Sequence, residues 1–185
     1  MFHAKEYVKA ESLEQAYELN QKRSNVLAGG MMWLKMSSGN RNTVIDLSGL
    51  GLDQIEETED EFRIGCMCSL RQLELHKGLN QYFDGAFREC TRWIVGTQFR
   101  NSATVGGSVF GRFGFSDILT CMMVLDSYVE LYKGGTVSLE EFAKMKYSRD
   151  ILVRIIIKKD GRKAAYASQR RSKTDFPLIA VAAAK

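Results

Sequence analysis

The sequence of 185 residues is poor in proline, histidine and cysteine. Pro177 is the only proline, so no proline-rich linker divides the chain. His3 and His76 stand alone and are expected on the surface. No C-x-x-C pair and no zinc-finger spacing with histidine occurs, which argues against an iron–sulfur or zinc centre within the chain. The sequence instead predicts four reduced, buried thiols, at Cys66, Cys68, Cys90 and Cys121.

Long hydrophobic segments are also lacking. No apolar run approaches the roughly 20 residues that a membrane helix needs. The longest run, from Ile151 to Ile157, is interrupted by Arg154. The first residues show no charged segment followed by an apolar one, as a secretory signal would. These features predict a cytoplasmic protein that does not contact a membrane.

The formal net charge of +4 is distributed unevenly. Residues 144–185 hold twelve Lys or Arg against three Asp or Glu, whereas residues 53–61 hold six acids and no base. The basic segment is either solvated surface or a face that meets a partner subunit or an anionic cofactor. No basic motif interleaved with aromatic residues and no helix-turn-helix signature occurs, which argues against nucleic-acid binding.

The first part of the chain is predicted to form a small α/β unit. Ser12 is expected to cap a helix over residues 11–19, followed by a strand over 25–28 and another over 43–47. Residues 53–60 are predicted to be an acidic loop. We place the boundary between two subdomains there, one covering residues 1–54 and the other 55–185.

The second subdomain is predicted to contain both strands and helices. Alternating or β-branched segments predict strands over residues 62–66, 128–132, 151–157 and 166–170, with a hairpin turn at Gly134-Gly135. Apolar spacing and caps predict helices over residues 70–75, 82–93, 116–125 and 139–143. A buried stripe is expected on the second of these helices, at Phe83, Phe87, Cys90 and Ile94. Residues 175–184 are compatible with either a strand or a helix.

Two glycine-rich turns carry the strongest functional signal. The first is Val26-Leu27-Ala28-Gly29-Gly30, and the second runs from Arg100 to Ser108 and is followed by Asp117. Adjacent glycines let the backbone approach a ligand closely and supply N–H donors, which a pyrophosphate requires. Thr104 and Ser108 add hydroxyl groups, and Asp117 is placed to accept a hydrogen bond from a sugar hydroxyl.

These turns alone leave two interpretations open. Neither the G-x-G-x-x-G signature nor the G-x-x-x-x-G-K-[ST] phosphate loop occurs. A pair of glycines is more often a structural turn than a phosphate site, and Gly134-Gly135 looks like such a turn. Residue types and spacing therefore predict only an α/β protein in which the two loops are candidates to bind a nucleotide.

A series of motifs covers nearly the whole chain in order. It comprises V-L-A-G-G at 26–30, R-I-G at 63–65, R-N-S-A-T-V-G-G-S at 100–108, L-D-S-Y-V-E-L at 125–131, S-L-E-E-F at 138–142, I-L-V-R-I-I-I at 151–157 and R-R-S-K-T-D at 170–175. This series resembles the FAD-binding subunit of molybdenum hydroxylases, the group of xanthine dehydrogenase and carbon monoxide dehydrogenase. The resemblance implies an α+β fold in which FAD lies between a small N-terminal α/β subdomain and a larger mixed-sheet subdomain.

The resemblance also implies which residues contact FAD. In the family, one glycine turn holds the pyrophosphate and the other holds phosphate and ribitol. Carried over by position, the FAD contacts are Val26, Leu27, Ala28, Gly29, Gly30, Met31, Met32, Trp33, Ile94, Thr104, Val105, Gly106, Gly107, Ser108, Asp117 and Leu152. For the apolar residues Ile94 and Leu152, packing in the core is an equally good interpretation.

Some positions depart from the family pattern. The departures are Met31 and Met32 in place of a polar pair, Ser108 in place of asparagine, Phe113-Gly114 in place of Ser-Pro, and Ala167 in place of a lysine. Arg112 and Lys35 are candidates to supply replacement charge. Family members usually continue into a small C-terminal domain, whereas this sequence ends at Lys185, so the expected fold lacks that domain.

By resemblance, the chain is an oxidoreductase subunit without catalytic side chains of its own. Electrons from a molybdopterin-binding large subunit would pass through [2Fe–2S] clusters on a small subunit to FAD, and then to NAD or another acceptor. A fold that has lost its flavin and acts as a scaffold is the alternative, favoured by Met31, Met32 and Ala167. A stand-alone flavin reductase is a third option, for which no nicotinamide site is evident.

Overall fold

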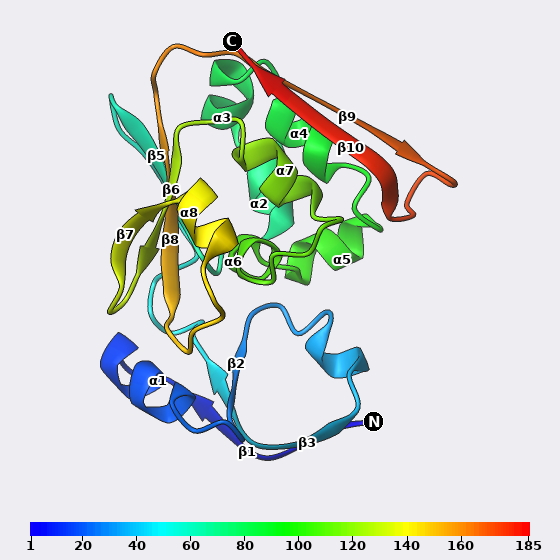
Figure 1. The fold of residues 1–185 in the computed structure, drawn as a ribbon. Coiled ribbons are helices and arrows are strands. Elements are labelled where there is room, and N and C mark those ends of the chain that lie inside the picture. The colour runs from blue at the N-terminus through cyan, green and yellow to red at the C-terminus, as the bar shows by residue number, and fades with distance from the viewer.

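The N-terminal part of the fold is a small parallel sheet with a helix. The computed structural model describes all residues from Met1 to Lys185. Its first sheet has the strand order β1-β3-β2, with β1 at Phe2–Lys9, β2 at Val26–Ala28 and β3 at Gly39–Asp46. Helix α1 (Leu13–Asn20) connects β1 to β2, and a short 3-10 helix, η1 (Leu34–Met36), lies between β2 and β3. This N-terminal unit occupies the lower part of Figure 1.

The predicted cap of helix α1 is confirmed, because the Ser12 hydroxyl accepts a hydrogen bond from the Gln15 N–H at 3.1 Å. Strand β1 was not predicted. It is an edge strand whose residues are mostly exposed, so its sequence lacks the apolar alternation of a half-buried strand. It is held instead by its parallel pairing with β3, from Phe2 opposite Gly39 to Lys9 opposite Asp46.

A five-stranded sheet forms the base of the larger part, with the order β4-β5-β8-β6-β7. Its strands are β4 (Ile55–Glu57), β5 (Glu61–Gly65), β6 (Ser127–Leu131), β7 (Gly135–Ser138) and β8 (Leu152–Lys158). All its pairings are antiparallel, whereas a mixed sheet was expected. The acidic segment expected as a loop contains β4, because Ile55 pairs with Ile64 of β5. Central strand β8 buries Val153, Ile155 and Ile157 in the core.

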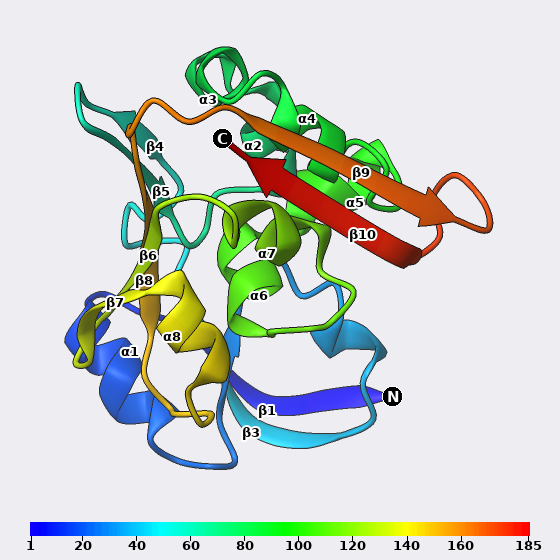
Figure 2. The same cartoon turned by 45° about the horizontal axis from the view of Figure 1, so that its top comes forward.

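Seven short helices accompany this sheet, and Figure 2 shows most of them gathered to one side of it. They are α2 (Leu70–Leu75), α3 (Lys77–Tyr82), α4 (Ala86–Thr91), α5 (Thr97–Ser102), α6 (Val105–Phe110), α7 (Asp117–Met122) and α8 (Leu139–Lys144). The longest helix of the whole fold, α1, has eight residues. No helix is therefore long and apolar enough to cross a membrane.

The prediction of a single helix over residues 82–93 is wrong. The chain breaks between α3 and α4, where Asp84 and Gly85 have φ angles of 50° and 82°. This left-handed turn ends one helix and starts the next. The predicted stripe is nevertheless buried at Phe83, Phe87 and Cys90. The left-handed turn interrupts the predicted helix but leaves the same side chains in the core.

The second glycine segment is helical rather than an open turn. Helices α5 and α6 flank Ala103 and Thr104, and Gly106 and Gly107 lie in the first turn of α6. Thr104 caps α6, with its hydroxyl accepting a hydrogen bond from the Gly107 N–H at 3.2 Å. This cap outweighs the low helix propensity of two glycines.

The chain ends in an antiparallel hairpin of β9 (Ala164–Arg170) and β10 (Pro177–Ala184). The hairpin lies across α4 and α7, as Figure 2 shows. Residues 177–184 therefore form a strand, which settles the choice that the sequence left open. The tip of the hairpin, between Arg170 and Pro177, reaches the region between the N-terminal unit and the helices, where the cavities described below lie.

Candidate functional site

The two glycine segments meet between the N-terminal unit and the rest of the fold. A Cβ atom added to Gly30 would stand 1.7 Å from the carbonyl oxygen of Ser102. One added to Gly29 would stand 2.7 Å from the hydroxyl oxygen of Thr104. Only glycine permits this approach at Gly30, because the obstacle is backbone and cannot rotate away. Part of the reason for these glycines is therefore the contact between the two segments themselves.

The first segment presents a run of unpaired amides. No backbone N–H from Gly29 to Trp33 donates a hydrogen bond within the protein. The run follows directly on the carboxyl end of parallel strand β2. Met31 within it has a φ of 61°, a left-handed conformation that is unusual for methionine. Successive N–H groups in such a loop form a concave set of donors that suits an anion.

The second segment offers a surface and hydroxyl groups rather than free amides. The Val105 and Gly106 N–H groups donate to the carbonyls of Cys68 and Cys66, at 2.8 and 2.9 Å, and that of Gly107 is used by the Thr104 cap. Gly106 faces the core, where a Cβ would lie 2.6 Å from that of Cys66. Gly107 is exposed and meets only the Thr104 hydroxyl, at 3.1 Å. Backbone donors for an anion therefore come from the first segment, and not from both as the sequence suggested.

Two cavities flank this meeting point. The larger has a volume of about 530 Å³ and the smaller about 270 Å³. Five residues line both cavities: Gly29, Thr104, Gly107, Phe110 and Tyr147. The two cavities therefore adjoin at the glycine contact, and together they form the cleft between the N-terminal unit and the larger part. A ligand that occupies both cavities must pass these five residues.

Most of the residues predicted to contact a cofactor line this cleft. The large cavity is lined by Gly29, Gly30, Met31, Met32, Trp33, Ile94, Thr104, Gly107, Ser108 and Asp117. The small cavity is lined by Val26, Leu27, Ala28, Gly29, Thr104, Gly106, Gly107 and Leu152. Val105 lines neither cavity, because its side chain is fully buried in the core.

Asp117 is the first residue of α7 and is 5% exposed. Its Oδ1 atom accepts hydrogen bonds from the hydroxyl of Tyr166 and from Nη2 of Arg170. Burial raises the pKa of Asp117, whereas the contacts with Tyr166 and Arg170 oppose that rise. No other residue donates a hydrogen bond to the second carboxylate oxygen. Asp117 therefore enters the wall of the large cavity as a fixed acceptor.

Arg170 and Tyr166 were not singled out from the sequence. Arg170 is nearly as buried as Asp117, and its Nη1 atom also donates to the Asp175 carbonyl. It thereby fixes the hairpin tip to the start of α7. The available signal was the position of Arg170 at the start of the R-R-S-K-T-D motif. Tyr166 lay in a predicted strand with no further sign of a polar role.

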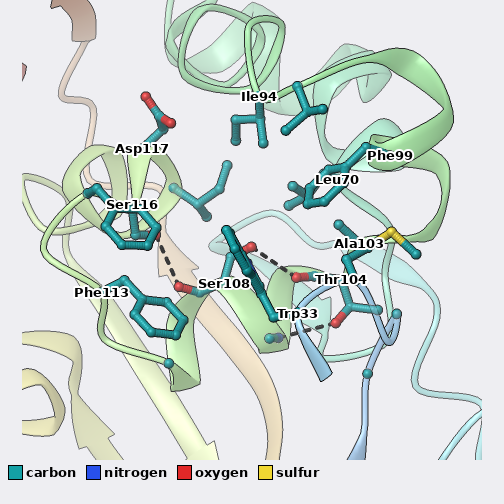
Figure 3. A pocket seen from close by; sticks show the side chains of 18 of the residues that line it. Trp33, Leu70, Ile94, Phe99, Ala103, Thr104, Ser108, Phe113, Ser116 and Asp117 are labelled. Atoms are coloured by element: carbon teal, nitrogen blue, oxygen red, sulfur yellow. Dashed lines mark hydrogen bonds between the residues drawn. The ribbon is translucent and has the colours of Figure 1, made fainter. Parts of the chain in front are cut away.

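Four aromatic rings from three segments form one wall of the large cavity. Trp33 stacks on Phe176 with ring centroids 5.7 Å apart, and Phe113 stacks on Phe115 at 5.2 Å. Each ring remains between 37% and 52% exposed. Figure 3 shows Trp33 and Phe113 on one side of the pocket and apolar side chains on the other, namely Leu70, Ile94 and Phe99. The space between these two walls, which we call the aromatic slot, favours a planar aromatic group.

Arg112, a candidate for replacement charge, is used elsewhere. Its guanidinium lies 4.1 Å from the ring centre of Phe142 and also close to the rings of Phe110 and Tyr147. It donates to the carbonyl of Met145. Arg112 does not line the large cavity, whose arginines are Arg41 and the Asp117-paired Arg170. Arg112 therefore supports the loop that carries Phe113, whereas Lys35 is exposed on η1.

These features suit a dinucleotide that carries an additional aromatic ring system. The comparisons identify the family: the family model described as the FAD binding domain in molybdopterin dehydrogenase matches residues 2–159. The chain belongs to this family, whose cofactor is FAD. The residues present fit that cofactor, since unpaired amides stand between an aromatic slot and a second cavity. When bound, FAD supplies electron transfer, which no side chain of the chain provides.

Two proteins are similar to the chain in sequence. The chain is 26% identical to the uncharacterized protein YgfM of Escherichia coli K12, over 97% of this chain and 69% of the relative. It is 26% identical to the alpha subunit of the 6-hydroxypseudooxynicotine dehydrogenase complex of Paenarthrobacter nicotinovorans, over 67% of this chain and 44% of the relative. The chain therefore spans only part of each relative.

Solved structures share the fold. The Cu,Mo-CO dehydrogenase in its cyanide-inactivated form superposes with a TM-score of 0.85 at 22% identity, covering 97% of this chain and 68% of the other. Quinoline 2-oxidoreductase from Pseudomonas putida 86 gives a TM-score of 0.83 at 17% identity, covering 98% of this chain and 66% of the other. At these identities the likeness establishes the α+β fold with its N-terminal unit and larger part.

Proposed function

We propose that this chain is the FAD-carrying electron-transfer subunit of a molybdenum-dependent hydroxylase or dehydrogenase. The observation that carries the proposal is the run of unpaired amides from Gly29 to Trp33, which lines the large cavity and begins at Gly29, a residue that both cavities share. The proposal also rests on membership of the FAD-binding family. The subdomains would meet at residue 54, with residues 1–54 supplying the amides and residues 55–185 supplying most of the cavity walls.

In this proposal the cofactor extends through both cavities. The amides of the first glycine segment and the Thr104 hydroxyl hold the diphosphate, and the absence of a side chain at Gly107 leaves room for it. The aromatic slot beside Trp33 receives the flavin ring in the larger cavity. The adenosine end lies in the smaller cavity, beside Val26 and Leu152. Asp117 accepts a hydrogen bond from the sugar chain through its unpaired oxygen.

The proposed partners are a molybdopterin-binding large subunit and a small subunit with [2Fe–2S] clusters. The relative from Paenarthrobacter nicotinovorans is named as one subunit of a dehydrogenase complex, which supports an assembly of this kind. Electrons would reach the FAD of this chain from the iron–sulfur subunit and leave to NAD or another acceptor. The role of the chain is then to hold the cofactor in place and to exclude water around it, in the cytoplasm.

A second candidate function is that of a scaffold that has lost its flavin. Met31 and Met32 line the large cavity but bring no hydroxyl to a phosphate, and Asp117 already binds two protein donors. A protein that is colourless as isolated and takes up no added FAD would favour this candidate.

The complex purified from its native source tests the main proposal. Metal and flavin analysis should find molybdenum, iron and FAD with this chain, and reduction by the substrate of the complex should bleach the visible flavin absorbance. Isolation of the chain without metal-containing partners, or a flavin absorbance that stays unchanged on reduction of the clusters, would contradict it.

A further inference from the structure

One side chain ties the N-terminal unit to the larger part next to the small cavity. Arg149, between α8 and β8, directs its guanidinium to the turn that joins α1 to β2. Nη2 donates to the carbonyls of Lys22 and Asn25, each at 2.9 Å, and to Oδ1 of Asn20 at 3.2 Å. Nε donates to the carbonyl of Asn20. We call these contacts the Arg149 clasp.

The clasp is reciprocated from the other side. The Asn20 side chain donates from Nδ2 to the Arg149 carbonyl at 2.8 Å, and Gln21 donates to the same carbonyl at 3.1 Å. Arg149 forms no ion pair with a carboxylate, so its guanidinium is committed to oxygen atoms of the N-terminal unit. An arginine satisfies several carbonyls at once because its planar fork carries five N–H donors. Lysine has no equivalent geometry.

The position of the clasp links it to the binding cleft as well as to the stability of the fold. Asn25 is followed at once by β2, and β2 leads directly into Gly29, where the unpaired amides begin. Arg149, Asn20 and Asn25 also line the small cavity. Fixing the start of β2 therefore fixes how far the amides stand from Thr104 and Gly107 on the opposite side of the cleft.

We propose that Arg149 is a positioning residue for FAD: its clasp holds the two sides of the cleft at the separation that a ligand bridging both cavities requires. This inference rests on the proposed function. The opposite flank of the cleft is closed by the stacked rings of Trp33 and Phe176, which are half exposed and make no such directed contacts. The clasp is thus the directed polar contact that sets the spacing together with the packing of Gly30 on Ser102.

The inference distinguishes bridging ligands from fragments. FAD must fit both cavities at once, whereas FMN or ADP occupies one cavity and can shift within it when the two sides of the cleft move. Loss of the clasp should raise the dissociation constant of FAD by about tenfold or more. A ligand that occupies both cavities gains affinity only when the two cavities are correctly placed relative to each other. The dissociation constants of FMN and ADP should change by less than about twofold.

The experiment compares Arg149→Met, Arg149→Lys and the matched control Arg154→Met in the full chain without cofactor. Arg154 pairs with Glu130 within the five-stranded sheet and does not contact the N-terminal unit. Calorimetric titration with FAD, FMN and ADP gives the affinities, and hydrogen exchange reports on the hydrogen-bonded residues 25–28 at the start of β2. We expect Arg149→Met to lose FAD affinity selectively and to exchange faster over residues 25–28, Arg149→Lys to be intermediate, and Arg154→Met to match the wild type.

Two results would overturn the inference. One is FAD affinity in Arg149→Met within about twofold of the wild type together with unchanged exchange over residues 25–28. The other is an equal loss for FAD, FMN and ADP, which a general loss of structure would produce. Failure of the wild type to bind FAD would instead refute the proposed function, while the exchange measurement would still report whether the clasp orders the first glycine segment.

Discussion

Gly30 packs so closely against Ser102 that a Cβ would stand 1.7 Å from the Ser102 carbonyl oxygen. Gly30→Ala must therefore push the two glycine segments apart, since no rotamer change relieves a clash with backbone. We expect a loss of about 1–3 kcal/mol in the free energy of unfolding, together with weaker FAD binding. Urea unfolding and FAD titration measure both. Gly96→Ala is the control, because no atom lies within 4 Å of a Cβ there.

Gly106 and Gly107 are neighbours with opposite surroundings, and valine at each should separate folding from cofactor binding. Gly106→Val places a branched side chain against Cys66 in the core and should prevent stable folding. Gly107→Val projects into the cleft and should keep the circular dichroism spectrum while removing bound FAD. Flavin content equal to that of the wild type in Gly107→Val would show that the diphosphate lies elsewhere.

The buried pair of Asp117 and Arg170 should be coupled in stability. Arg170→Met leaves a buried carboxylate without its cation and should cost about 3–5 kcal/mol. Asp117→Asn removes the opposite charge, and the double variant should be less destabilised than the sum of the two single ones. Urea unfolding of all four proteins gives the coupling energy. Additive effects would indicate that the pair contributes nothing beyond its separate members.

Acid should destabilise the fold partly through Glu74. Burial raises the pKa of this carboxyl, but its ion pairs with Arg71 and Arg100 outweigh burial and lower it overall. The folded pKa therefore lies below the unfolded value of about 4.5. The stabilisation is complete above the unfolded pKa and is lost as pH falls through the folded pKa.

Unfolding free energies between neutral and acidic pH measure this contribution. Glu74→Gln should be less stable than the wild type at neutral pH, because Arg100 is left buried beside an uncharged group. Its stability should then fall less steeply as pH decreases. Parallel pH profiles for the two proteins would exclude Glu74 as a contributor.

Local signals predicted the parts of the fold that depend on neighbouring residues. The cap at Ser12 correctly began α1, the helix predicted over residues 70–75 is α2, and the β-branched run from residue 151 to 157 gave the central strand β8. Strand β1 escaped prediction because its pairing with β3 joins residues far apart in the sequence. The break at Asp84 was missed because the apolar spacing continues across it, although Asp84-Gly85 is a dipeptide typical of turns.

The residues of the candidate site likewise fall into two groups, those that the local sequence indicates and those that only the fold brings together. The glycine pairs and Asp117 were visible because their residue types are unusual at that spacing. Arg149 and Arg170 were not, since an arginine in a basic segment gives no indication of which carbonyls or carboxylates the fold brings to it. The roles of the amides also required the structure, because those of Val105 and Gly106 are used by Cys68 and Cys66.

The most direct test of the account is titration of FAD into the cofactor-free wild-type chain, followed by gel filtration and measurement of flavin absorbance against protein. We predict that one FAD is retained per chain and that FAD quenches the fluorescence of Trp33, which lines the large cavity. A folded chain that emerges without flavin after exposure to saturating FAD would contradict the account.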